Sequence, residues 1–223
     1  MSWMAVPLYA AAQGLPNAQI GTLLSIPVLV QAPLNLVGGA YTDRLGGRRI
    51  LVASTCAMAA AALWLLAAQG FWMLILGQFA LAFSRAVFWP STWAMASELP
   101  GARGEQLGRL NAATNIGQIG GNLLCGVLLA ASGFAAAFGA LSAIAAAALL
   151  AALKTADAAP RGLQPARSPF ALGGLGWNAS LLATPLAMGY LADRIGLPAA
   201  FYAIALALLA SVGALAAMRR WAF

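Results

Sequence analysis

One charged residue lies in the middle of a long apolar stretch of this sequence. Arg85 stands about midway between Phe71 and Glu98, among mostly apolar residues. A guanidinium in apolar surroundings costs about 2.5–3.5 kcal/mol on membrane-insertion scales, so it needs an anion, a carbonyl group or water as a partner. Arg85 is therefore a candidate for binding an anionic ligand. The alternative is a structural arginine whose head group reaches backbone carbonyls or a membrane interface.

Four amide side chains recur at helical spacing further along the chain. Asn111, Asn115, Gln118 and Asn122 are separated by four, three and four residues, which places them on one stripe of a helix. Amides in apolar surroundings must form hydrogen bonds. The stripe therefore predicts either the wall of a polar binding cavity, with Arg85 among its possible partners, or hydrogen bonds between neighbouring helices.

The composition places these residues in a membrane. Hydrophobic residues make up 62% of the 223 residues and charged residues only 8%, whereas about a quarter of the residues are charged in a soluble domain. The apolar runs have the length of about twenty residues that a helix needs to cross the hydrocarbon core. Since a backbone in hydrocarbon must satisfy its own hydrogen bonds, we predict an all-α membrane protein surrounded by the lipid bilayer, without a soluble domain.

The sequence offers little for covalent or metal chemistry. It contains no histidine, the usual general base near neutral pH and the commonest metal ligand. Cys56 and Cys125 lie inside predicted spans without metal-ligand spacing. The formal net charge is +7, but the cations form short clusters between apolar runs and make no basic face for nucleic acid. We expect no enzyme activity, no catalytic residue, no cofactor, no metal site and no nucleic-acid partner.

Apolar runs and turn residues predict a polytopic helical bundle of about seven full spans after a partial first helix that ends at Ala12. The polar, proline-bearing stretch 154–168 is the one credible linker, and it divides the chain into 1–153 and 169–223. The predicted spans are Ala18–Tyr41, Arg49–Ala68, Phe71–Ser97, Gln106–Ala131, Phe134–Leu153, Pro169–Ala192 and Pro198–Met218.

Basic residues fall in alternate loops of this predicted topology. Clusters around Arg44, Arg103, Lys154 and Arg219 share one side, whereas only Arg194 falls on the other. Lys and Arg accumulate on the cytoplasmic side of membrane proteins. We therefore expect a multi-pass protein of the cell (inner) membrane whose C-terminus lies in the cytoplasm.

One predicted loop carries a specific pattern. The segment from Gly39 to Leu51 reads GAYTDRLGGRRIL and joins the second and third predicted helices. It resembles the signature loop of the major facilitator superfamily, G-x-x-x-D-R-x-G-R-[RK], with Gly47 where the first basic residue often stands. An ordinary positive-inside loop is the alternative. The candidate signature-loop and gating residues, with Glu98 as a partner for Arg44 or Arg48, are Gly39, Asp43, Arg44, Gly46, Arg48, Arg49 and Glu98.

An internal repeat extends the resemblance. Residues 121–138 align with residues 184–201 and keep several glycines and alanines in register. In the major facilitator superfamily the fifth and sixth of twelve helices correspond to the eleventh and twelfth. The resemblance thus implies a first half with a truncated first helix in 1–153, the last two helices in 169–223, and missing helices seven to ten. The segment 189–196 also matches the signature loop, but an eight–nine assignment would place Arg219 and Arg220 outside.

The resemblance implies a transporter, shortened or fragmentary, that moves a small organic solute by alternating access. An anionic solute is one option. The alternative is a transport-incompetent membrane fragment that acts as a regulatory or assembly partner, because alternating access normally needs both halves. Self-association would complete the bundle. The substrate-binding candidates are Arg85, Asn111, Asn115, Gln118 and Asn122.

Overall fold

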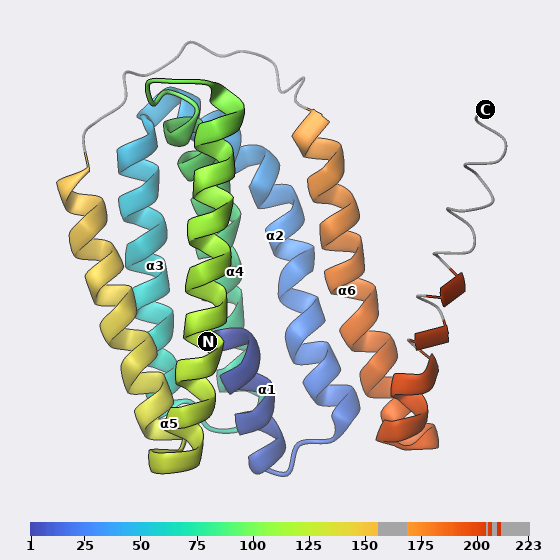
Figure 1. Cartoon of the computed structure of the whole chain (residues 1–223). Coiled ribbons are helices and arrows are strands. Elements are labelled where there is room, and N and C mark those ends of the chain that lie inside the picture. Colours follow the sequence, from blue (N-terminus) through green and yellow to red (C-terminus); the bar gives the residue numbers. More distant parts are fainter. Residues whose placement is uncertain (156–168, 204, 207–208, 211–223) are drawn as a thin grey trace, which may run out of the picture.

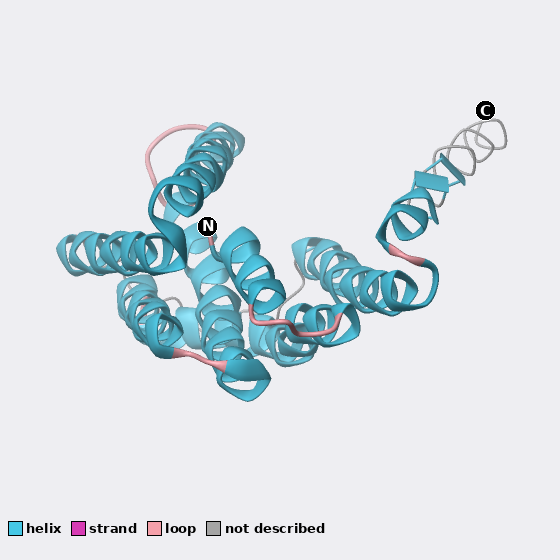
Figure 2. Ribbon diagram, turned by 90° about the horizontal axis from the view of Figure 1, so that it is seen from below, coloured by secondary structure: helices cyan, strands magenta, loops and turns pink. Residues whose placement is uncertain are grey.

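The computed structural model of the chain is a bundle of helices (Figures 1 and 2). It describes residues 1–155, 169–203, 205–206 and 209–210, and these residues include no strand. The all-α prediction is confirmed, and the predicted helix bounds agree to within about four residues. The helices are α1 (Ser2–Ala12), α2 (Asn17–Leu45), α3 (Gly47–Ala67), α4 (Gly70–Ala96), α5 (Arg103–Lys154) and α6 (Pro169–Ile195).

Three of these helices, α3, α4 and α5, are both long and apolar enough to cross a membrane. Seven full spans are therefore not confirmed. The helices α2 and α6 have 29 and 27 residues but fall outside this group. Helix resumes at residue 197, and most of the predicted last span, Pro198–Met218, lies outside the described residues.

α5 contains two helical segments that run in opposite directions (Figure 1). They meet at Gly133, whose φ of 76° and ψ of −170° are not helical. A positive φ is easy only for glycine, because a side chain would collide with the backbone there. The segments 103–132 and 134–154 correspond to the predicted spans Gln106–Ala131 and Phe134–Leu153.

The turns gather at two ends of the bundle (Figure 1). We call the end with Gly46, residues 97–102 and Lys154 the basic end, because every described Lys and Arg except Arg85 and Arg194 lies toward it. The far end holds the turns at Gly14, Gly70, Gly133 and Gly196, all of which have positive φ. The clustering of basic residues at one end agrees with the predicted alternation of loops.

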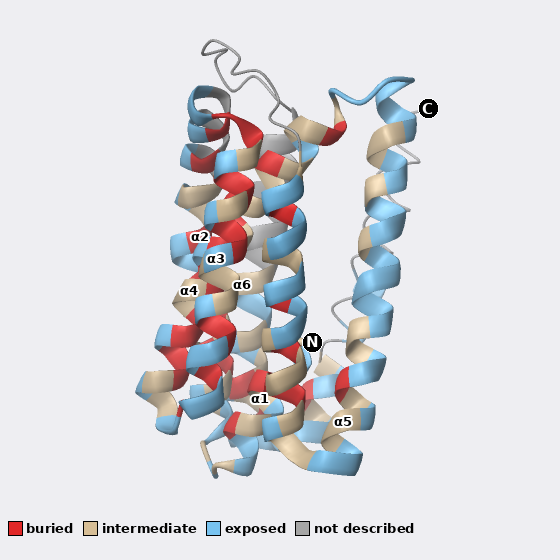
Figure 3. Ribbon diagram, turned by 90° about the vertical axis from the view of Figure 1, so that its left-hand side faces the viewer, coloured by how far each residue is buried: buried red, intermediate tan, exposed pale blue. Residues whose placement is uncertain are grey.

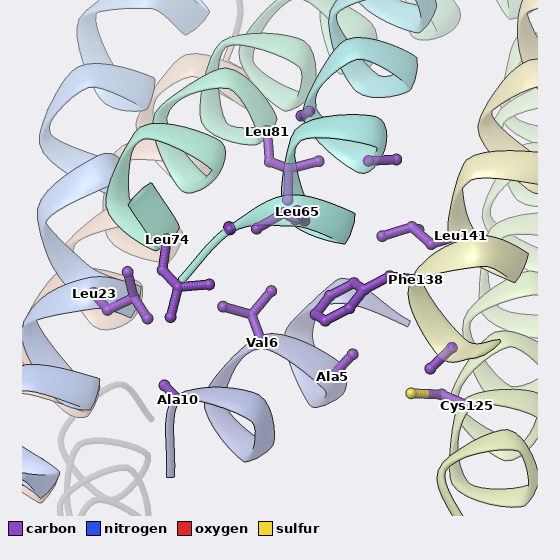
Figure 4. Packing of buried hydrophobic residues seen from close by; sticks show 14 of the residues in the cluster. Ala5, Val6, Ala10, Leu23, Leu65, Leu74, Leu81, Cys125, Phe138 and Leu141 are labelled. Atoms are coloured by element: carbon purple, nitrogen blue, oxygen red, sulfur yellow. The ribbon is translucent and has the colours of Figure 1, made fainter. Parts of the chain in front are cut away.

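The hydrophobic core is concentrated where α1 packs between the longer helices (Figure 4). Phe138 of α5 points toward Ala5 and Val6 of α1, and all three are buried. The ring of Tyr9 also contacts two phenylalanine rings. Its centroid lies 5.0 Å from that of Phe134 and 5.3 Å from that of Phe138. The short α1 thereby adds to the packing of α5, which also contacts α3 directly.

α2 and α6 pack against each other so closely that their backbones touch. A Cβ atom added to Gly21 would collide with the carbonyl oxygen of Pro185, and one added to Gly189 would collide with that of Asn17. The two helices run in opposite directions (Figure 1). Only glycine permits this approach, which resembles the small-residue contacts of membrane helices.

We predict that Gly21→Ala destabilises the protein, because α2 and α6 must separate to admit the methyl group. Overpacking of this kind costs about 1–3 kcal/mol. Gly120→Ala is the matched control: it lies in a helix interior, and nothing lies within 4 Å of its added Cβ. Thermal unfolding in detergent should lower the midpoint for Gly21→Ala and leave it unchanged or raised for Gly120→Ala. Equal midpoints for the two variants would contradict the close contact.

Candidate functional site

Arg85 lies within α4 and is partly buried. Its Nε donates a hydrogen bond of 3.3 Å to Oε1 of Gln31 in α2. Its guanidinium carbon lies 4.6 Å from the ring centroid of Trp3 in α1, a distance typical of cation–π contacts. Three helices thus contribute to the surroundings of one cation.

The approach of α2 to α4 explains why Gln31 reaches Arg85. A Cβ atom on Gly38 would lie 3.2 Å from the carbonyl oxygen of Ala86 and 3.3 Å from Cγ1 of Val87, so the two helices are in tight contact there. Gln31 precedes Gly38 by seven residues and shares its helix face. The long side chain of a helical residue leans toward the helix N-terminus, which directs Arg85 back toward the level of Gln31.

The predicted amide stripe does not surround Arg85. Asn111, Asn115 and Gln118 are exposed on the first segment of α5, which stands apart from the other helices (Figure 3). Asn122 accepts a hydrogen bond of 3.2 Å from the amino group of Met1. The amide beside Arg85 is therefore Gln31 of α2, and no described amide of α5 forms a hydrogen bond with it. Sequence reasoning missed Gln31, because it is a single amide without a periodic pattern.

The signature-loop residues divide between a helix end and a tight turn. Gly46 has a φ of 87° and ends α2. A Cβ on Gly47 would lie 2.6 Å from Cγ of Met95, so this turn packs directly on α4. A basic residue here, as in the signature pattern that the loop resembles, would require Met95 to move, which gives a physical reason for glycine at this position.

Arg48 connects the signature loop to a distant helix end. Its Nη2 donates a hydrogen bond of 2.8 Å to the carbonyl oxygen of Leu153, in the last turn of α5. A cation at a helix C-terminus satisfies a carbonyl that has no partner in its own helix. Arg44, Arg49 and Glu98 are exposed near the same end. Gly39 and Asp43 belong to the last turns of α2, and Asp43's side chain is outside the described part.

A long-range contact that sequence reasoning did not predict lies at the far end. The Asp193 carboxylate of α6 accepts hydrogen bonds from the N-terminus of α2: Oδ1 from the backbone N–H of Asn17 at 3.1 Å and from its Nδ2 at 2.9 Å, and Oδ2 from the N–H of Ala18 at 2.7 Å. The motif at 189–196 was visible, but its partner lies 176 residues away in sequence. Spacing alone cannot identify such a pair.

These bonds stabilise the ionised carboxylate. Asp193 follows the predicted span that ends at Ala192, and the hydrogen bond from the Ala18 amide, with those from Asn17, lowers the pKa of its carboxyl group below the usual value. A carboxyl whose pKa is lowered by folding stabilises the fold above its unfolded pKa, and the contribution is lost as the pH falls through the folded pKa.

The described residues include no group of three or more His, Cys, Asp or Glu side chains that could hold a metal ion. What they do offer is a partly buried cation with an amide and an indole, and two long-range contacts at opposite ends of the bundle. Such groups can bind a solute or hold helices together, and they contain no nucleophile paired with a general base.

Comparison with known families agrees with this arrangement. The model of a family described as Major Facilitator Superfamily matches residues 1–171. The matched region covers α1 to α5 and the beginning of α6. Because 171 of the 223 residues are matched, the chain belongs to the major facilitator superfamily of membrane transporters.

Proposed function

We propose that the chain moves a small organic anion across the membrane by alternating access, with Arg85 as the group that binds it. The observation that carries the proposal is the environment of Arg85. Its hydrogen bond to the neutral Gln31 amide is 3.3 Å long, whereas a bond from a guanidinium to an ionised acceptor is typically about 2.7–2.9 Å. A carboxylate or phosphate offers a stronger and bidentate acceptor than one amide oxygen.

Gln31 and Trp3 fit a site that must also be stable without solute. Gln31 is 5% exposed and provides a neutral acceptor for the guanidinium. Trp3 provides a ring face for the same cation. Neither partner neutralises the charge, so an anion would still gain a full electrostatic attraction in a medium of low dielectric constant. Solute binding by the exposed amides Asn111, Asn115 and Gln118 stays a prediction, and the site proposed at Arg85 does not depend on them.

We expect Arg85→Ala to weaken binding of carboxylated solutes by about ten- to hundredfold, the factor that corresponds to the loss of one hydrogen bond to a charged group. Arg85→Lys should restore binding only in part, because an ammonium lacks the bidentate fork. Gln31→Glu should also weaken anion binding, since a resident carboxylate would compete for the guanidinium. Binding to purified protein, measured against matched anionic and neutral solutes, checks all three variants.

Arg109→Ala provides the matched control for loss of a positive charge. Arg109 lies on α5, where its exposed side chain pairs with Glu105 at 2.6 Å. Exposed pairs of this kind contribute only about 0–1 kcal/mol, so the fold should tolerate the change. Unchanged binding in Arg85→Ala, or an equal loss in Arg109→Ala, would leave Arg85 with a structural role only.

We further propose that the basic end faces the cytoplasm of a cell whose inner membrane holds the protein, with the C-terminus on the same side. The positive-inside rule supports this orientation. In a background with Cys56→Ala and Cys125→Ala, an impermeant maleimide should label Leu197→Cys in intact cells and Lys154→Cys only after permeabilisation. Both replaced residues are exposed, at the far and basic ends respectively. Labelling of Lys154→Cys in intact cells would reverse the orientation.

A second candidate function is assembly, in which the chain is a transport-incompetent partner of itself or of another membrane protein. The first segment of α5 favours it: Ile116 and Ile119 are 72% and 70% exposed, and the amides beside them have no described side chain covering them. Exposed amides in hydrocarbon favour helix association. The segment 103–132 is therefore the face through which a second copy would complete the bundle.

Interchain crosslinking separates assembly from transport. If copies associate through the amide stripe, Asn115→Cys should form an interchain disulfide in membranes, whereas Ala113→Cys, on the opposite side of the same helix, should not. Both positions are exposed in the chain. Crosslinking at Asn115→Cys without solute uptake by reconstituted protein would favour assembly. Uptake without such crosslinking would favour a transporter that acts as a single chain.

A further inference from the structure

The interface between α2 and α6 is held by different forces along its length. At the far end the Asp193 carboxylate binds the first two backbone N–H groups of α2, the shortest bond being 2.7 Å to Ala18. One turn further in, Gly189 and Gly21 allow backbone contact with the facing helix. Because carbonyl and Cα atoms meet directly there, even a small separation of the helices weakens these contacts markedly.

The carboxylate meets a helix terminus that has no other cap. The residue before α2 is Pro16, which provides no side-chain hydrogen bond to the helix. The positive end of the α2 dipole adds to the attraction for an ionised carboxylate. The neighbouring Arg194 does not join the contact, since its guanidinium lies 4.6 Å from the ring centroid of Tyr190. Asp193 is thus the one charged group on this terminus among the described residues.

The C-terminal ends of α2 and α6 carry similar sequence patterns. α2 ends with GAYTDRLG from Gly39 to Gly46, and α6 ends with GYLADRIG from Gly189 to Gly196. Because the helices run in opposite directions, their Asp-Arg pairs lie at opposite ends of one interface (Figure 1). The far-end copy of the pattern therefore has a position equivalent to that of the signature loop at the basic end.

We propose that Asp193 is a gating residue that keeps the far end of the α2–α6 interface closed, and that release of its hydrogen bonds to α2 opens this end to solvent. The inference rests on the alternating access proposed above for its role in transport. The opening itself can be measured without a solute, so failure of one proposal is distinguishable from failure of the other.

Ser25 provides the site for a reporter. It is fully buried, its hydroxyl has no hydrogen-bond partner, and it follows Gly21 by one helical turn on the face toward α6. Ser25→Cys therefore breaks no side-chain hydrogen bond and places a thiol within the interface. With Cys56→Ala and Cys125→Ala in the background, the rate of labelling by a water-soluble maleimide reports how often the interface opens.

In this background Asp193→Asn should raise the labelling rate of Ser25→Cys at least several-fold, because the neutral amide keeps the shape of the carboxylate but loses its charge and one acceptor. Arg194→Gln, which removes the adjacent charge outside the contact, should leave the rate unchanged. Gly189→Val calibrates the reporter, since its side chain must push α2 and α6 apart.

An unchanged rate in Asp193→Asn, measured where Gly189→Val labels fast, would overturn the proposal and leave the interface held by packing alone. If Asp193→Asn does not fold, Asp193→Ser repeats the test with a shorter neutral acceptor, and the same two outcomes decide it. Solute uptake by the parent protein is measured separately. If Asp193→Asn is labelled faster but the parent protein takes up no solute, the proposal that Asp193 closes the interface stands and the proposed transport function fails.

Discussion

The unpaired backbone groups at helix ends govern how this bundle is held together. The first N–H groups and last carbonyl groups of a helix have no partner within it. At three helix ends of this chain a distant side chain provides the missing partner. Asp193 binds the start of α2, Gln13 accepts a hydrogen bond of 2.7 Å from the N–H of Gly70 at the start of α4, and Arg48 binds the carbonyl of Leu153 at the end of α5. Each cap is also a connection between helices that are far apart in sequence.

The positions of the helices could be predicted from the sequence, whereas their contacts could not. Apolar runs and turn glycines predict where helices begin and end, because each segment's own residues decide whether it is more stable in hydrocarbon or in water. The contact of Arg85 with Gln31, or of Asp193 with Asn17, depends on the packing of two helices and has no local signal. The amide stripe shows the limit clearly: its periodicity is real, yet Asn111, Asn115 and Gln118 point out of the chain's own bundle. Periodicity says that residues share a face, and it does not say what covers that face.

The glycines serve two different purposes in the fold. Gly46 and Gly133 adopt positive φ where the chain reverses. Gly21, Gly38 and Gly189 lie inside helices, where they cost helix propensity but let another backbone approach. Gly47 shows how such a contact modifies a family pattern, because the packing of Met95 against this position favours the absence of a side chain. The side chain that a motif position can carry therefore depends on how closely the neighbouring helix packs.

The reversal at Gly133 bears on how the chain enters a membrane. Gly133 is the one residue with non-helical angles between the two segments of α5. With so short a connection, the two segments cannot enter the membrane far apart from each other. They are suited to insertion as a helical hairpin, in which the apolar segment 134–154 assists the partition of the amide-bearing segment 103–132. The segment 134–154, which is rich in alanine and leucine, can thus help the segment with the amide stripe to enter the bilayer. The turn at Gly133 therefore matters both for the folded bundle and for insertion of the chain into the membrane.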